Sequence, residues 1–191
     1  MAKSSGLGDN LYVAGYDLSG DVGSLGRIGG GPAALDVTPI NKFAMERLGG
    51  IRDGSIEYTS FFNPAALQSH VAHKDLPRTD VMVTYARGTT LGNPGAAMIG
   101  KQVNYDPTHG QDGSLTFGVQ ALANSYGLEW GRQLTAGLRT DTAATNGASI
   151  DTTAAASFGW QAYLQVTAVT GTSVTVSIED SANDSGWAAR A

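Results

Sequence analysis

The chain has 191 residues, enough for one sizeable domain whose core needs no disulfide or metal to hold it together. It contains no cysteine, which excludes disulfide scaffolds, thiolate metal sites and cysteine nucleophiles. Charged residues make up only 15% of the chain and the net charge is −5, so the basic surplus of a nucleic-acid-binding protein is absent. A surface this weakly charged fits either burial in an assembly or a turn-rich β protein.

No apolar run approaches the roughly 20 residues that a membrane-spanning helix requires. Residues 1–10 contain one cation and no apolar stretch behind it, which predicts a flexible N-terminal arm and no secretory signal. We therefore expect a protein made and folded in a cytoplasm, without a membrane partner.

The first third of the chain predicts short strands separated by a long loop. An apolar run at 11–18 indicates a strand, with 22–25 as its hairpin partner. Gly29, Gly30 and Gly31, followed by proline, indicate a break in regular structure, so residues 26–52 are predicted to form a long mobile loop.

A turn, a strand and a helix are predicted next. Asp53-Gly54 is a turn signal, and the alternating residues behind it, 55–62, indicate a strand. Asn63 can cap a helix and Pro64 suits a first helical position, which predicts a helix over 65–74. Leu67 and Val71 are expected on its buried face.

The clearest strand signal lies further along. Leu115, Phe117 and Val119 alternate with polar or small residues, so these three side chains are expected to face a core. Further strands are predicted at 80–86, 96–105 and 126–134. The fold class is therefore mainly β, an antiparallel β-sandwich or open barrel with one short edge helix and long loops.

The C-terminal part differs in composition. Residues 141–157 are rich in Thr, Ala, Ser and Gly and are predicted to be a linker between a β domain (11–140) and a C-terminal piece (158–191). That piece contains two expected strands, 161–167 and 173–178. Two strands alone are marginal in water, so this piece needs a partner, more chain or the main domain.

No arrangement of residues indicates catalysis. His70 and His73 lie three residues apart on the predicted helix, but Asp75 is poorly placed as a third metal ligand, so both are expected to be surface histidines. The glycines at 29–31 lack the strand-to-helix context and the GKS/GKT motif of a phosphate cradle. We expect no enzyme, no metal and no cofactor.

Several motifs together resemble one protein family. They are LDVT at 35–38, GIRDGSI at 50–56, FNP at 62–64, VTY at 83–85, DGSLTF at 112–117 and YGLEWG at 126–131. This pattern over residues 10–140 resembles the tail-tube proteins of long-tailed bacteriophages. Residues 174–187 resemble the first strands of a small β-sandwich often appended to phage tail proteins, which normally continues past the tryptophan. Here it is either truncated or has another role.

The resemblance implies self-assembly into stacked, hexameric rings that form a hollow tube for genome delivery. In that family the long loop reaches the neighbouring ring, which here implies an inter-ring role for Gly29, Gly30, Gly31, Asn41, Lys42 and Arg47. The implied partners are further copies of the chain and other tail proteins, with DNA passing through unbound. The implied location is the virion tail, assembled in the cytoplasm of a bacterial host.

A channel for DNA has to let phosphate slide, which favours a neutral or acidic lining. Glu57, Thr59, Thr116 and Gln120 are predicted to line it, because they alternate with the expected core positions. Two other classes remain open: another virion component, such as a capsid decoration or minor tail protein, and a carbohydrate-binding surface module.

Overall fold

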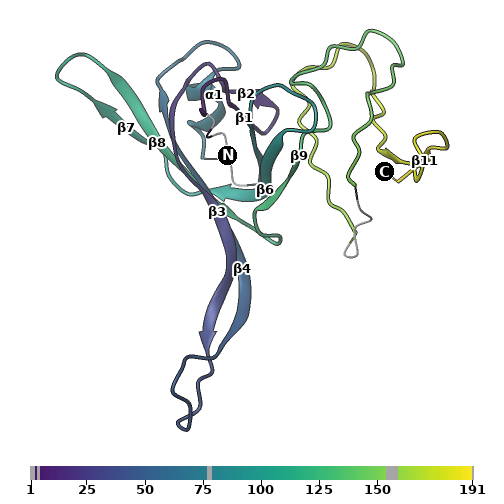
Figure 1. Ribbon diagram of the computed structural model, residues 1–191. Coiled ribbons are helices and arrows are strands. Elements are labelled where there is room, and N and C mark those ends of the chain that lie inside the picture. Colours follow the sequence, from purple (N-terminus) through teal and green to yellow (C-terminus); the bar gives the residue numbers. More distant parts are fainter. Residues whose placement is uncertain (1–2, 4, 77–78, 154–158, 191) are drawn as a thin grey trace.

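The computed structural model describes residues 3, 5–76, 79–153 and 159–190 (Figure 1). One short helix, α1 (Ser69–His73), accompanies eleven strands over this part of the chain. The strands are β1 (Asn10–Val13), β2 (Tyr16–Asp17), β3 (Val22–Asp36), β4 (Arg47–Phe61), β5 (Val81–Ala86), β6 (Pro94–Gln102), β7 (Asp106–His109), β8 (Leu115–Ala123), β9 (Glu129–Arg132), β10 (Glu179–Asp180) and β11 (Ala188–Ala189).

Nine of these strands form a single antiparallel sheet that folds over one core. The strand order is β2-β1-β5-β6-β8-β4-β3, with β7 also paired to β8 and β9 also paired to β6. Between its two halves the sheet is joined by only a short pairing, Gly100–Gln102 with Ala121–Ala123. Buried side chains from β1, β5 and β6 and from β4 and β8 belong to one cluster, so the two halves enclose a common core. The expected mainly β fold with one short helix is confirmed.

The alternation that predicted the core-facing strand is also confirmed. Phe117 and Val119 of β8 are buried against Ile56 and Tyr58 of β4 in the central cluster. Leu115, at the first position of β8, is only partly buried. The β4–β8 pairing therefore forms one wall of the core.

The N-terminal region differs from the expectation. The run at 11–18 forms two strands, β1 and β2, which pair with each other across a turn at Ala14-Gly15, and β3 pairs with β4 instead. The described residues of the N-terminal segment 1–10, which was expected to be flexible, are bound to the body. The Tyr85 hydroxyl donates to Asp9 (2.5 Å), and the Arg87 guanidinium donates to the Ser5 carbonyl (2.8 Å). Residues 1, 2 and 4 of this segment lie outside the described residues.

The helix is shorter than predicted, because Leu67 has a left-handed backbone (φ 64°), which a right-handed helix cannot include. Its side chain, expected on the buried face, is exposed. Asn63 does not cap α1; its side chain accepts the Ala65 N–H and donates to the carboxylate of Asp21. The other Asp21 oxygen accepts the Ser69 N–H at 2.9 Å and so supplies the partner that this first helical N–H needs.

His73 was predicted to lie on the surface and is fully buried, so that prediction is wrong. Its Nδ1 lies 2.9 Å from the Gln102 side-chain oxygen, and its Nε2 lies 2.8 Å from the Tyr58 hydroxyl. Because the Gln102 oxygen can only accept, His73 carries its proton on Nδ1, and the Tyr58 hydroxyl donates to Nε2. One imidazole thus links α1 to β4 and β6. The helical pattern could not show this, since the partners come from distant strands.

Two further regions depart from the sequence-based expectation. The strand β7 (Asp106–His109) was not expected, and the strand expected over 126–134 is shortened to β9. In the C-terminal piece, residues 161–167 and 173–178, where strands were expected, are not in a sheet; the two-residue strands β10 and β11 pair instead.

Burial lowers the pKa of His73 below its ordinary value of 6.5, with the Gln102 hydrogen bond opposing weakly. The unfolded chain therefore takes up a proton at a pH where the folded chain does not. The free energy of unfolding should thus be steady above about pH 7.5 and fall as the pH drops through 6.5 toward the lower folded pKa.

Chemical denaturation at several pH values between about 7.5 and 5.5 measures this fall in stability. The control is His73→Gln, which should be less stable at every pH but lose less stability across that window. An equal slope in both proteins would rule out His73 as the source.

Candidate functional site

The most prominent feature of the molecule is a long two-stranded arm that leaves the body (Figure 1). We define the arm as residues 26–52. The sequence predicted a mobile loop here, but β3 and β4 remain paired from Val22↔Ser60 out to Asp36↔Arg47, and only residues 37–46 form the connecting loop. The nine residue steps from Arg27 to Asp36 make a ribbon about 30 Å long. The prediction of a loop is therefore wrong over most of its length.

The glycines explain both the arm and the error in predicting it. Gly30 pairs with Gly54, and a Cβ on Gly30 would lie only 2.3 Å from the Asp53 carbonyl oxygen. A Cβ on Gly54 would lie 2.6 Å from the backbone nitrogen of Leu128, which crosses the strand there. These glycines permit close approach of backbones at the base of the arm. Asp53-Gly54 is therefore the interior of β4, and the predicted turn is wrong.

The loop at the end of the arm is held by its own hydrogen bonds. Thr38 Oγ1 donates to the Asp36 carboxylate (2.6 Å) and accepts the Glu46 N–H (2.8 Å), while the Val37 N–H bonds the Glu46 carbonyl (3.0 Å). Hydrogen bonds from the Thr38 hydroxyl and N–H lower the pKa of Asp36. Lys42 and Glu46 add an ion pair at 2.9 Å. These contacts give the loop a defined conformation.

Apolar side chains cover the end of the arm and contact little else. Ile40 and Phe43 are as exposed as in an extended peptide (107% and 108%). Further exposed apolar residues along the arm are Leu35, Val37, Met45, Leu48 and Ile51. We call Val37, Ile40, Phe43 and Met45 the apolar tip. Exposed apolar side chains gathered at one place mark an interaction surface.

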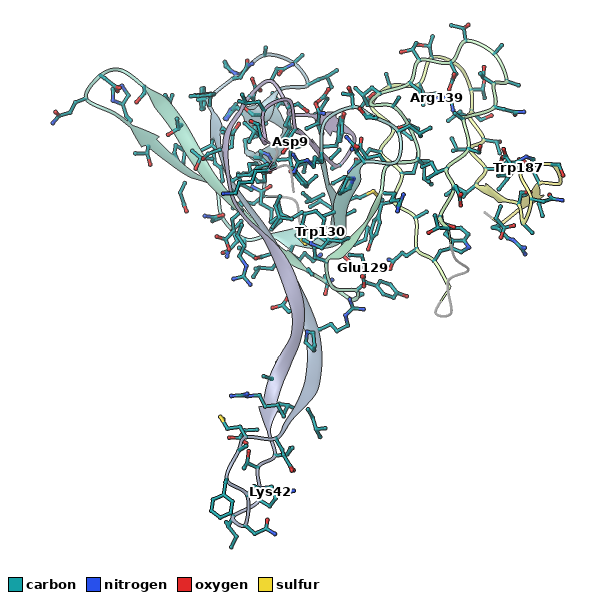
Figure 2. The ribbon with its side chains drawn as sticks, in the orientation of Figure 1. Asp9, Lys42, Glu129, Trp130, Arg139 and Trp187 are labelled. Atoms are coloured by element: carbon teal, nitrogen blue, oxygen red, sulfur yellow. The ribbon has the colours of Figure 1, made fainter. Side chains whose placement is uncertain are left out.

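The predicted inter-ring residues divide between the two ends of the arm. Gly29, Gly30 and Gly31 lie near its base, inside β3, whereas Asn41 and Lys42 lie in the end loop and Arg47 begins β4. Figure 2 shows Lys42 at the far end of the arm. The sequence missed Ile40 and Phe43, whose apolar character amid a polar stretch was the available signal.

The predicted lumen residues share one face of the β4–β8 pair, opposite the core. Glu57 lies beside Gln120 in register, and the Gln120 amide donates to the Glu57 carboxylate at 3.0 Å. Thr59 and Thr116 follow on the same face, and all four side chains are half-buried. Shallow depressions here are lined by Glu57, Thr59 and Gln120 and by Arg27 of β3. The structure thus brings these four residues onto one polar surface.

A third feature, which the sequence did not reveal, is how the C-terminal piece attaches. The Gln165 side-chain oxygen accepts the Gly15 N–H at 2.8 Å, and its amide nitrogen donates to the Met82 carbonyl (3.0 Å) and lies 3.2 Å from Thr84 Oγ1. A Cβ on Gly15 would lie 2.7 Å from the Val166 carbonyl oxygen, so the segment sits closely on the β1–β2 turn. The main domain is thus the partner that the C-terminal piece needed.

The described residues offer no group of three or more His, Asp or Glu side chains that could hold a metal ion. Within the same part of the chain, no helix is long and apolar enough to cross a membrane.

No family model and no curated protein matches the chain. Among the solved structures that match the chain are two at 15% sequence identity. One is a chain of "Tail of empty GTA particle computed with helical refinement, C6 symmetry" (TM-score 0.46, covering 57% of this chain and 81% of that one). The other is a chain of "Virion of native gene transfer agent (GTA) particle" (TM-score 0.49, covering 67% and 98%). Both scores lie below 0.5, and neither likeness by itself assigns a function.

Gly54→Ala tests the close approach at the base of the arm. The added Cβ must displace the Leu128 backbone, so we expect a loss of about 1–3 kcal/mol in the free energy of unfolding by denaturant titration. Gly118→Ala on β8, where a Cβ meets nothing within 4 Å, is the matched control and should cost much less. Equal losses would contradict the explanation.

Proposed function

We propose that this chain is a structural, non-catalytic protein of a phage-type virion, which assembles with its own copies into the stacked rings of a tail tube. One observation carries the proposal: the arm presents an apolar tip at the end of a paired two-stranded ribbon. Two side chains of the tip, Ile40 and Phe43, are fully exposed, and an isolated protein gains nothing from holding them in water. Burying these two side chains against a neighbouring copy removes their apolar surface from water and therefore stabilises the contact.

The open sheet supplies contacts of a second kind. The sheet does not close, so β2 and β3 each have an edge with no neighbouring strand in the described chain. Such edges favour pairing with another chain. A contact between different surfaces of identical copies either closes into a ring or continues as a filament, and a tube of stacked rings uses both.

The polar surface of β4 and β8 suits the channel of such a tube. It carries the carboxylate of Glu57, hydrogen-bonded to Gln120, and the hydroxyls of Thr59 and Thr116. A weakly acidic lining repeated around each ring repels phosphate and lets DNA slide. The motifs at 35–64 that resemble tail-tube proteins support the same assignment.

Electron microscopy of the purified protein tests the proposal against its rivals. Stacked rings or tubes are the expected result. Single rings without stacking would favour a decoration or minor tail protein, and monomers that bind glycans would favour a carbohydrate-binding module.

The double variant Ile40→Asp/Phe43→Asp tests the role of the arm. Because two buried charges at each copy would oppose docking, we expect stacking to be lost, as seen by microscopy and by light scattering, while the melting temperature stays unchanged. The matched control is Thr108→Asp on β7, an exposed strand away from the arm, which should leave stacking intact. Normal tubes from the double variant would contradict the proposed role.

A further inference from the structure

The C-terminal piece forms a surface with two unlike sides. Within residues 161–167, Tyr163 and Gln165 are partly buried, and Gln165 is turned toward the body. Leu164 and Val166, which alternate with them, face outward with 51% and 42% of their surface exposed. Because Gln165 fixes the segment to the β1–β2 turn, the outward side chains are held in one orientation.

Exposed apolar side chains continue beyond this segment. Val174 and Val176 are 57% and 50% exposed, within a stretch, 173–177, in which every residue is exposed. Further exposed apolar residues of the piece are Trp160, Val169 and Trp187. We call the exposed side chains of Leu164, Val166, Val174 and Val176 the tail face. Figure 1 shows the piece at the side of the body, away from the end of the arm.

The backbone of this piece also lacks the hydrogen bonds of a sheet over most of its described length. In the described residues 159–177, no backbone N–H or C=O bonds another backbone group, although the alternating Val and Thr residues favour strand pairing. A segment whose backbone groups pair with no described backbone group, and which exposes alternating apolar side chains, is suited to receive another β-structure. The occupant should itself be an apolar ribbon.

The same chain contains one such ribbon, with the opposite charge. The arm (26–52) carries four basic and two acidic residues, a net of +2, while the C-terminal piece (158–191) carries one basic and three acidic residues, a net of −2. Arg47 of the arm has no carboxylate within ion-pair distance in the described chain, and neither has Glu179 of the C-terminal piece. The arm and the C-terminal piece thus both expose apolar side chains and carry opposite net charges.

We infer that the tail face is the receptor for the arm of a second copy: the apolar tip of one copy docks on the tail face of its neighbour. This inference rests on the proposed function and specifies its contact. The two surfaces differ, so the contact is directional, and each copy both gives an arm and receives one.

Because the chain has no cysteine, single cysteines report this contact without interference. Phe43→Cys places a thiol in the apolar tip and Val174→Cys places one in the tail face; His109→Cys on β7 is the exposed control. The variants are mixed in pairs, one of each pair labelled with ¹⁵N, oxidised mildly and analysed by mass spectrometry. The Phe43–Val174 disulfide between copies should exceed every other pairing at least about tenfold, because docked thiols react at an effective concentration near millimolar.

The outcomes separate the inference from the proposed function. Tubes with a dominant tip-to-tail disulfide support both. Tubes in which tip-to-tip or tip-to-control disulfides equal it, or in which none forms, overturn the inference and leave the tube role standing. A dominant tip-to-tail disulfide in complexes that never form rings or tubes supports the inference and contradicts the tube role. If neither rings or tubes nor the tip-to-tail disulfide form, the inference and the proposed function are both contradicted.

Discussion

A two-stranded ribbon buries too little apolar surface to hold itself in water, so the arm depends on the continuity of β4 with the core. The second half of β4 lies between β3 and β8 and places Ile56 and Tyr58 in the central cluster. The first half continues outward paired with β3 alone. Gly54 marks the transition, where the Leu128 backbone crosses the strand. The direction of the arm is thus set by core packing, and the apolar tip is presented on a fixed support.

Buried polar contacts hold the remaining pieces to this frame. The Tyr58–His73–Gln102 chain ties the short helix to both halves of the sheet, and Asp21 fixes the backbone at the start of that helix. Gln165 attaches the C-terminal piece in the same manner. Each of these side chains satisfies backbone or side-chain groups that would be costly to leave unpaired. The buried polar groups named here thus find their partners within the body, while the arm and the tail face each keep an apolar surface exposed.

The sequence predicted those features that depend on local periodicity. Alternation in β4 and β8 predicted the mainly β fold, the buried Phe117 and Val119, and the shared polar face of Glu57 and Gln120. It failed where a residue serves a distant contact. The glycines at 29–31 indicated a loop because their close approach to β4 is invisible in sequence, and His73 and Gln165 find partners many residues away. The apolar residues Ile40 and Phe43 are visible in the sequence, but only the ribbon that carries them shows that they are exposed.

The central claim is that the arm is free in the isolated chain and buried between copies in the assembly. Hydrogen–deuterium exchange of the purified protein, compared before and after assembly, measures this directly. We expect the amides of the end loop that make no hydrogen bond in the isolated chain, those of residues 40, 41 and 43–45, to become strongly protected on assembly, while those of the core strand β8 change little, since they are already paired. Assemblies in which these end-loop amides exchange as fast as in the isolated chain would contradict the central claim.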